Sequence, residues 1–125
     1  MEHSFRETNH KIAEFMPNMV WIVPANKAYS PYWRKVDEQG LPIKDYKAGK
    51  DLLYHYYWND LMPVVDYIES LTGEDGRGKV NYVVTMDSSY CVISLGGEEI
   101  VADYQGENRM DSTYNAILKF IDSRK

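Results

Sequence analysis

The fold of this chain is decided by one continuous stretch near its middle. It reads Leu52-Leu-Tyr-His-Tyr-Tyr-Trp-Asn-Asp-Leu-Met-Pro-Val-Val-Asp-Tyr-Ile-Glu-Ser-Leu71. Its first part is a dense block of aromatic residues, which favour a pleated strand and predict one over residues 52–57. Its second part places apolar residues at helical spacing and polar residues on the opposite face, which is typical of an amphipathic helix. The stretch therefore predicts a strand followed directly by a helix.

A proline sets the expected start of this helix. Inside a helix a proline costs about 3 kcal/mol, but in the first turn its missing N–H would have been unpaired anyway. With Asn59 or Asp60 as the N-cap, Pro63 falls in or just beyond that turn. Gly73 can end the helix in a left-handed cap. We therefore expect a central helix over residues 60–72.

Two further helices follow from the same periodicity. Ile12, Phe15 and Met16 share one helical face, and the proline that follows them ends a short helix over residues 8–16. A stripe of apolar residues after Asp111 predicts a C-terminal helix over residues 111–123.

Short runs of β-branched and aromatic residues between turn signals predict the remaining strands. These runs are residues 19–23, 32–36, 80–86, 90–95 and 99–104. The runs at 80–86 and 90–95 form an antiparallel hairpin, and both of its faces carry apolar side chains. Such a sheet is usually covered on both sides. Residues 41–49 are typical of a loop.

These elements predict a single α+β domain spanning residues 1–125. Its antiparallel sheet has about four or five strands and packs with the three helices. A chain of 125 residues can bury one core without disulfides or a structural metal.

The charge and the cysteine content of the chain indicate which partners and which cellular compartment to expect. The net charge of −5 and the isoelectric point near 5.1 argue against a phosphate backbone as ligand, so no nucleic acid is expected. The single cysteine, Cys91, cannot form an intramolecular disulfide and fits a reducing compartment. No amino-terminal basic-then-apolar stretch indicates export, and the apolar runs are shorter than the roughly 20 residues of a membrane helix. A cytoplasmic protein with no membrane partner is expected.

A glycine-rich segment imitates a phosphate-binding loop. Residues Gly73-Glu-Asp-Gly-Arg-Gly-Lys-Val80 match that pattern through the lysine. A phosphate loop follows a strand, opens a helix and has Ser or Thr after its lysine, whereas this segment is expected to follow a helix and open a strand. We therefore expect a flexible helix-to-strand connection.

The titratable residues give no convergent catalytic or metal site. His10 and Glu14 lie one helical turn apart, which favours an exposed ion pair over zinc, because a closed zinc site needs four ligands. His55 with Asp60 could serve a hydrolase, but no nucleophile accompanies them, and a hydrogen-bonded strand histidine is the simpler interpretation. Cys91 lies among apolar neighbours and is expected to be buried and inert. No cofactor, metal or enzymatic activity is predicted.

The aromatic residues are the best candidates for a binding surface. They exceed what a core of this size needs, and Tyr and Trp are enriched at protein interfaces. The candidate binding residues are Tyr32, Trp33, Tyr54, His55, Tyr56 and Trp58. They allow two hypotheses: an interface for another protein, or an aromatic-lined pocket for a small ligand, with His55 at its polar end. Edge strands of the sheet also allow a homodimer.

Several segments resemble a known group of proteins in order and spacing. They are Asn9-His-Lys-Ile-Ala-Glu-Phe-Met16, Tyr54-His-Tyr-Tyr-Trp-Asn-Asp-Leu-Met-Pro-Val-Val65, Ile68-Glu69, Cys91-Val-Ile93 and Tyr114-Asn-Ala-Ile-Leu-Lys-Phe-Ile121. The group consists of short uncharacterised proteins encoded by gut anaerobes and their phages or prophages, similar in layout to the phage ABA-sandwich domain. Many members have Trp where this chain has Asp60 and Ser where it has Tyr57. Residues 29–49 match nothing in the group.

The resemblance implies a genetic setting and no chemistry. Small acidic proteins carried by phages often act by binding a host protein. The expected function is therefore a non-enzymatic accessory or interaction protein associated with a phage or prophage, with a host or phage protein as its partner.

Overall fold

The computed structural model describes residues 5–47, 52–74, 76 and 78–124. The contacts divide the chain into two compact units, residues 1–53 (unit 1) and residues 54–125 (unit 2), which are treated separately. The described residues form an α+β protein with three helices and two antiparallel sheets, one of three strands and one of four. The α+β prediction is confirmed. The prediction that residues 1–125 are one domain stays a prediction.

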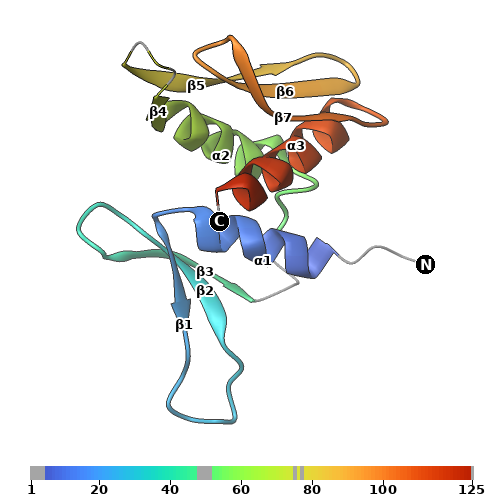
Figure 1. Ribbon diagram of the computed structural model, residues 1–125. Coiled ribbons are helices and arrows are strands. Elements are labelled where there is room, and N and C mark those ends of the chain that lie inside the picture. The colour runs from blue at the N-terminus through green and yellow to red at the C-terminus, as the bar shows by residue number, and fades with distance from the viewer. Residues whose placement is uncertain (1–4, 48–51, 75, 77, 125) are drawn as a thin grey trace. The chain divides into compact units, whose positions relative to one another are not determined.

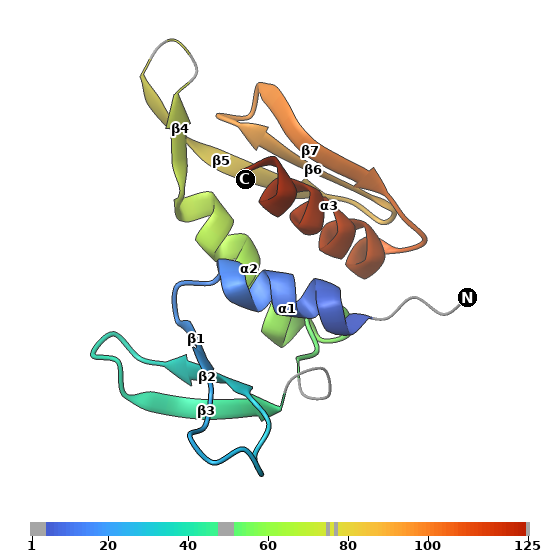
Figure 2. The same cartoon turned by 60° about the horizontal axis from the view of Figure 1, so that its bottom comes forward.

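Unit 1 combines one helix with the three-stranded sheet. Its elements are α1 (Phe5–Phe15), β1 (Met19–Ile22), β2 (Tyr32–Val36) and β3 (Pro42–Lys47), and the sheet order is β1-β2-β3. Figure 2 shows α1 running beside this sheet. A buried asparagine of α1, Asn9, donates through Nδ2 to the carbonyl oxygen of Leu52 at 2.6 Å and so holds the end of the unit against the helix.

Two boundaries in unit 1 differ from the sequence prediction. The first helix begins at Phe5, three residues before the expected start at residue 8. Most of the segment 41–49 is the strand β3 and not a loop, while residues 48 and 49 lie outside the described residues. β3 is fixed by its pairing with β2, in which Trp33 lies opposite Tyr46 and Arg34 opposite Asp45. This cross-strand pairing cannot be read from β3 alone.

Unit 2 contains a four-stranded meander and two helices. Its elements are α2 (Trp58–Ser70), β4 (Thr72–Glu74), β5 (Lys79–Met86), β6 (Tyr90–Leu95), β7 (Glu99–Gln105) and α3 (Arg109–Ser123), and the sheet order is β4-β5-β6-β7. The predicted strands 80–86, 90–95 and 99–104 are confirmed to within one residue. The C-terminal helix begins two residues early, capped by Asn108, whose Oδ1 accepts from the amide of Asp111 at 2.9 Å.

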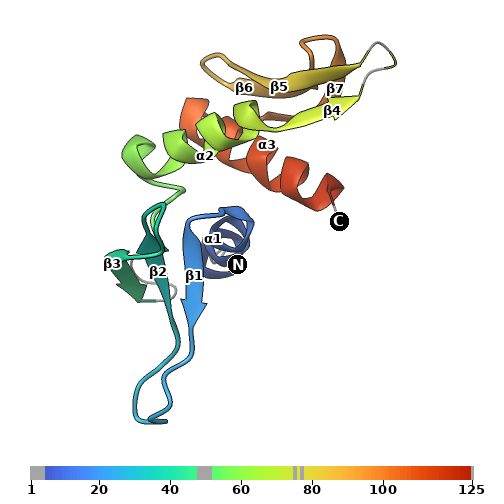
Figure 3. The ribbon, with the colours of Figure 1, turned by 90° about the vertical axis from the view of Figure 1, so that its left-hand side faces the viewer.

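Both helices of unit 2 lie on the same face of its sheet, as Figures 1 and 3 show. The core between the two helices and the sheet consists of apolar side chains from α2, β6, β7 and α3. These are Leu61, Val64, Val65, Ile68, Cys91, Ile93, Leu95, Ala102, Tyr114, Ala116, Ile117, Phe120 and Ile121. Within this unit the expectation of helices on both faces is wrong. The other face carries half-buried valines, Val83 and Val92, on strands that pair through Val83 with Ser94 and Thr85 with Val92.

The aromatic block does not form the predicted strand. Residues 54–56 are a turn that leads into α2, which begins at Trp58. Tyr57 is the N-cap and makes no side-chain capping hydrogen bond, so the predicted caps, Asn59 and Asp60, lie inside the helix. Pro63 consequently lies in the second helical turn, where its exposed ring replaces an amide that would have bonded within the helix. Strand propensity of aromatic residues depends on pairing with a neighbouring strand, and none of the described strands pairs with residues 52–57.

Gly73 lies in a strand and not in a helix cap. The helix ends at Ser70 with Leu71 as C-cap, and β4 pairs with β5 from Thr72 to Glu74. A Cβ at Gly73 would lie 2.8 Å from Tyr82 Oη and 2.9 Å from Leu95 Cδ1, so glycine allows the close approach of these side chains. The segment that imitates a phosphate loop is therefore a connection between two paired strands, with residues 75 and 77 outside the described part.

No helix in the described part of the chain has the length and apolar character needed to cross a membrane.

Candidate functional site

The six candidate binding residues lie on three different elements. Tyr32 and Trp33 belong to β2 in unit 1, Tyr54, His55 and Tyr56 form the turn before α2, and Trp58 is the first residue of α2 in unit 2. Their side chains also differ in solvent exposure. Trp33 and Tyr54 are buried, Tyr32, His55 and Trp58 are half-buried, and Tyr56 is exposed.

Trp33 lies in the core of unit 1. It is 3 % exposed, and its Nε1 donates to His10 Nδ1 at 3.0 Å. The His10 ring also makes edge-on contacts with Trp33, at a centroid distance of 5.1 Å, and with Trp21, at 4.9 Å. The predicted ion pair between His10 and Glu14 is therefore wrong, because the imidazole is held by two indoles from the sheet. The helical spacing of His10 and Glu14 gave no indication that Trp21 and Trp33 of the sheet contact the imidazole.

Tyr32 lies on the opposite face of β2 from Trp33, where a polar cluster forms. Arg34 donates through Nη2 to Tyr32 Oη at 3.1 Å and contacts Asp45 through two hydrogen bonds, at 2.8 and 3.3 Å. The hydrogen bond from Arg34 lowers the pKa of Asp45, and the same bond raises the pKa of Arg34. This fork ties β2 to β3 on the face away from Trp33.

His55 lies between aromatic rings. Its ring centroid is 6.4 Å from that of Tyr56 and 6.1 Å from that of Tyr114 in α3. Burial lowers the pKa of His55, since desolvation disfavours the imidazolium. The environment therefore favours the neutral ring at physiological pH.

Two tyrosines at the start of α2 form the most exposed aromatic pair in the described part of unit 2. Tyr56 is 66 % exposed and Tyr57 is 50 % exposed. Their rings meet edge to face at a centroid distance of 4.7 Å. Such a geometry is favoured by the ring quadrupoles and holds two large side chains in place before any partner arrives. Tyr57 was not among the candidate residues, although it belongs to the same aromatic segment as Tyr54, His55 and Tyr56.

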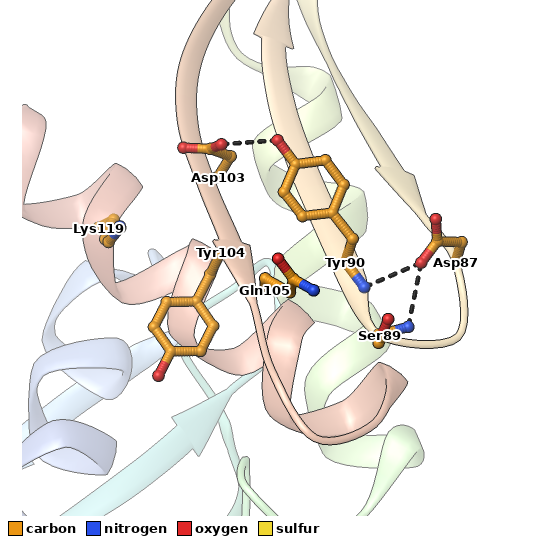
Figure 4. Close-up of a pocket in the computed structure, with 7 residues that line it drawn as sticks. All are labelled: Asp87, Ser89, Tyr90, Asp103, Tyr104, Gln105 and Lys119. Atoms are coloured by element: carbon orange, nitrogen blue, oxygen red, sulfur yellow. Dashed lines mark hydrogen bonds between the residues drawn. The ribbon is translucent and has the colours of Figure 1, made fainter.

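A second candidate surface is an open hollow at the edge of the sheet in unit 2, shown in Figure 4. It is lined by Asp87, Ser89, Tyr90, Asp103, Tyr104, Gln105 and Lys119. Tyr90 Oη donates to Asp103 Oδ2 at 2.6 Å, and this hydrogen bond raises the pKa of Tyr90. The ammonium group of Lys119 lies over the Tyr104 ring, 5.4 Å from its centroid.

Sequence reasoning missed this hollow because it depends on strand register. Tyr90 pairs with Gln105, and Val92 pairs with Asp103, which brings Tyr90 and Asp103 into diagonal contact. Lys119 comes from α3, many residues later. The sequence placed Tyr90 and Asp103 on two predicted strands, but it did not show how these strands align, so it could not predict that the two side chains meet.

The described residues contain no group of three His, Cys, Asp or Glu side chains placed to hold a metal ion. Cys91 is fully buried in β6, as predicted. Burial raises the pKa of its thiol to about 11, although a hydrogen bond with Thr113 acts in the opposite direction. A thiol with so high a pKa forms little thiolate near neutrality, and thiolate is the reactive form.

The raised pKa of Cys91 makes the stability of unit 2 pH-dependent. The folded thiol has the higher pKa, so the unfolded chain loses this proton first and stability falls as pH rises from 9.0 to about 11. We expect the free energy of unfolding to fall by up to about 1.4 kcal/mol per pH unit in this window. Urea unfolding at pH 7, 9, 10 and 11 measures it.

The matched control for this prediction is Cys91→Ala, which keeps every other titrating group. The variant should lose only the part of the alkaline decline that comes from the thiol. If both proteins lose stability equally between pH 9 and 11, the thiol is not the cause.

Comparison of the chain with protein-family models, with curated proteins and with solved structures found no significant match.

Proposed function

We propose that this chain is a non-enzymatic accessory protein, associated with a phage or prophage, that acts by binding another protein in the cytoplasm. The observation that carries the proposal is the exposed pair Tyr56 and Tyr57 before α2, whose rings meet edge to face. Tyrosine supplies a large, rigid contact area with a polar hydroxyl, and it is enriched at the centre of protein interfaces.

Another exposed apolar side chain of α2 supports the proposal. Met62, one helical turn into α2, is also an exposed apolar side chain at 37 %. Methionine adapts its shape to a partner because its side chain is unbranched and flexible. The pair Tyr56 and Tyr57 is the aromatic surface to which the experiments below refer.

The phage setting and the identity of the partner rest on the resemblance stated above. That resemblance includes Tyr56 and Trp58 within its longest matching segment. A host protein or another phage protein is the partner class that it implies.

Affinity purification from lysate of the host bacterium tests the proposal. The tagged chain should retain one specific protein, and Tyr56→Ser combined with Tyr57→Ser should release it, because the contact area of both rings is lost. An aromatic anchor of an interface is typically worth 2 kcal/mol or more, which is roughly a 30-fold loss of affinity.

The matched control is Tyr29→Ser, which removes a ring that is 67 % exposed in unit 1. It should leave the partner bound. Turnover of a nucleotide or ester substrate by the purified chain would contradict a non-enzymatic role, and an empty capture would contradict a binding role.

A further inference from the structure

We propose that the outer edge of β7 binds an extended, basic segment of the partner protein, which joins the sheet of unit 2 as an additional strand. This inference rests on the proposed function, since it describes how one part of a protein partner is recognised. Strand addition at a sheet edge is a recurring mode of peptide recognition, in which main-chain hydrogen bonds give affinity and alternate side chains give specificity.

The backbone of β7 presents unpaired groups along its outer side. β7 is the last strand in the order β4-β5-β6-β7, so only one of its sides is paired. The amide of Gly106 donates to the carbonyl oxygen of Ser89 at 2.8 Å, which places Gly106 in a hydrogen-bonded pair with β6. Because such pairs alternate along an antiparallel ladder, the backbone groups of Asp103 and Gln105 point outward.

The opposite edge of the same sheet is partly covered. β4 pairs with the first residues of β5, and beyond them the amides of Tyr82 and Val84 already have acceptors. The amide of Tyr82 donates to the carbonyl oxygen of Leu71 at 3.2 Å, and the amide of Val84 donates to Glu69 Oε2 at 3.1 Å. Within the described part of the chain, no acceptor of this kind faces the amides of Asp103 and Gln105. Outward amides without acceptors at a sheet edge are a template on which another extended chain can pair.

The side chains along β7 differ between its two faces. Asp103 and Gln105 lie on the face away from the helices, where Tyr90 donates to Asp103 (Figure 4). Tyr104 lies on the helix face, beneath Lys119 of α3. An added strand would present alternate side chains to these two faces. Lysine or arginine suits the positions beside Asp103, and a small apolar side chain suits those beside the Tyr104 ring.

Charge favours a basic segment over a second copy of this chain. Residues 54–125 include twelve acidic and six basic residues, whereas residues 1–53 include seven acidic and eight basic residues. Unit 2 therefore carries the negative charge of the chain. Two copies that met at this edge would bring like charges together, while a basic strand would be attracted and oriented.

A synthetic peptide tests the inference with the full chain. The probe is the capped heptapeptide Lys-Thr-Lys-Val-Lys-Thr-Lys, which places its lysines on one face of a strand, and the matched control replaces every Lys by Glu. In titrations followed by amide NMR, the lysine peptide should shift the amides of Asp103 and Gln105 first. At equal concentration, the glutamate peptide should cause shifts of these amides that are at least about tenfold smaller, because Asp103 and the net negative charge of unit 2 repel it.

Two variants separate the backbone contact from the charge contact. Gln105→Pro removes the outward N–H without touching the β6 ladder and should weaken the peptide by roughly threefold to tenfold, while Gln105→Ala keeps the N–H and should not. Asp103→Asn retains the acceptor for Tyr90 but removes one charge, and it should weaken the peptide by up to about fivefold at low salt. The NMR spectrum of each variant verifies that it is folded.

Three results would overturn the inference: shifts confined to other elements or absent, equal binding of the two peptides, or a dimer in solution that Gln105→Pro dissociates. The capture experiment with Tyr56 and Tyr57 does not use this edge. A chain that retains a partner through its aromatic surface but ignores the lysine peptide loses only this inference, whereas an empty capture removes the proposed function itself.

Discussion

Trp33→Ala is expected to lower the free energy of unfolding of unit 1 by about 3–5 kcal/mol, as large-to-small substitutions of buried aromatic residues do. Trp33 is almost completely buried, and its loss leaves a cavity between α1 and the sheet. It also removes the donor to His10 Nδ1 and the ring that stacks against Trp21, 5.1 Å away. Urea unfolding followed by far-ultraviolet circular dichroism measures the change.

The adjacent residue provides the control for this prediction. Tyr32 lies on the opposite face of β2 and is half-buried, so Tyr32→Ala should cost no more than about 1 kcal/mol. Equal losses of stability in the two variants would contradict the placement of Trp33 on the buried face of β2 and Tyr32 on the other face. Because Trp33→Ala is expected to destabilise unit 1, a loss of partner binding in this variant would not show that Trp33 contacts the partner.

Phe120→Ala is expected to destabilise unit 2 by a similar amount, about 3–5 kcal/mol. Phe120 is fully buried in α3 and meets the Tyr82 ring edge to face at a centroid distance of 5.0 Å. The buried thiol of Cys91 offers a local readout, because a thiol reagent reaches it only when the unit opens. A loss of 3 kcal/mol should accelerate labelling by about 100-fold or more.

Lys119→Ala is the matched control for Phe120→Ala, since it changes the neighbouring residue on the exposed side of α3. It removes only the contact of an ammonium group with the Tyr104 ring, which is worth about 0.5–1 kcal/mol at an exposed site. Labelling of Cys91 that is equally fast in both variants, or unchanged in Phe120→Ala, would contradict the role assigned to Phe120 in the core.

The sequence predicted those helices and strands whose own residues show the pattern of the element, without reference to a partner elsewhere in the chain. The apolar stripe of α3, with Ile117 and Ile121, was visible in the sequence because burial on one face imposes it. The strands β5, β6 and β7 were visible as runs of β-branched and aromatic residues between turn signals. Elements that depend on a distant partner were missed. β3 exists through its pairing with β2, whereas residues 54–56 have the composition of a strand but pair with none of the described strands.

The candidate site was predictable only in part for the same reason. The prediction of a strand over residues 32–36 already implied that Tyr32 and Trp33 face opposite sides, but not which side α1 would cover. The acceptor of the Trp33 indole, His10, comes from another element. The hollow beside β7 is lined by residues of β6 and β7 and by Lys119 of α3. The sequence pattern predicted neither the alignment of the two strands nor the position of α3 beside them.

The difference between the two edges of the sheet in unit 2 has a consequence for assembly size. Head-to-tail growth of copies would require the β7 edge of one chain to meet the β5 edge of the next. At that second edge the amides of Tyr82 and Val84 are occupied by Leu71 and Glu69, so this described part of β5 cannot accept the β7 edge of another copy. We therefore expect strand pairing at the β7 edge to end after one event and to yield a complex of fixed stoichiometry in place of a fibre.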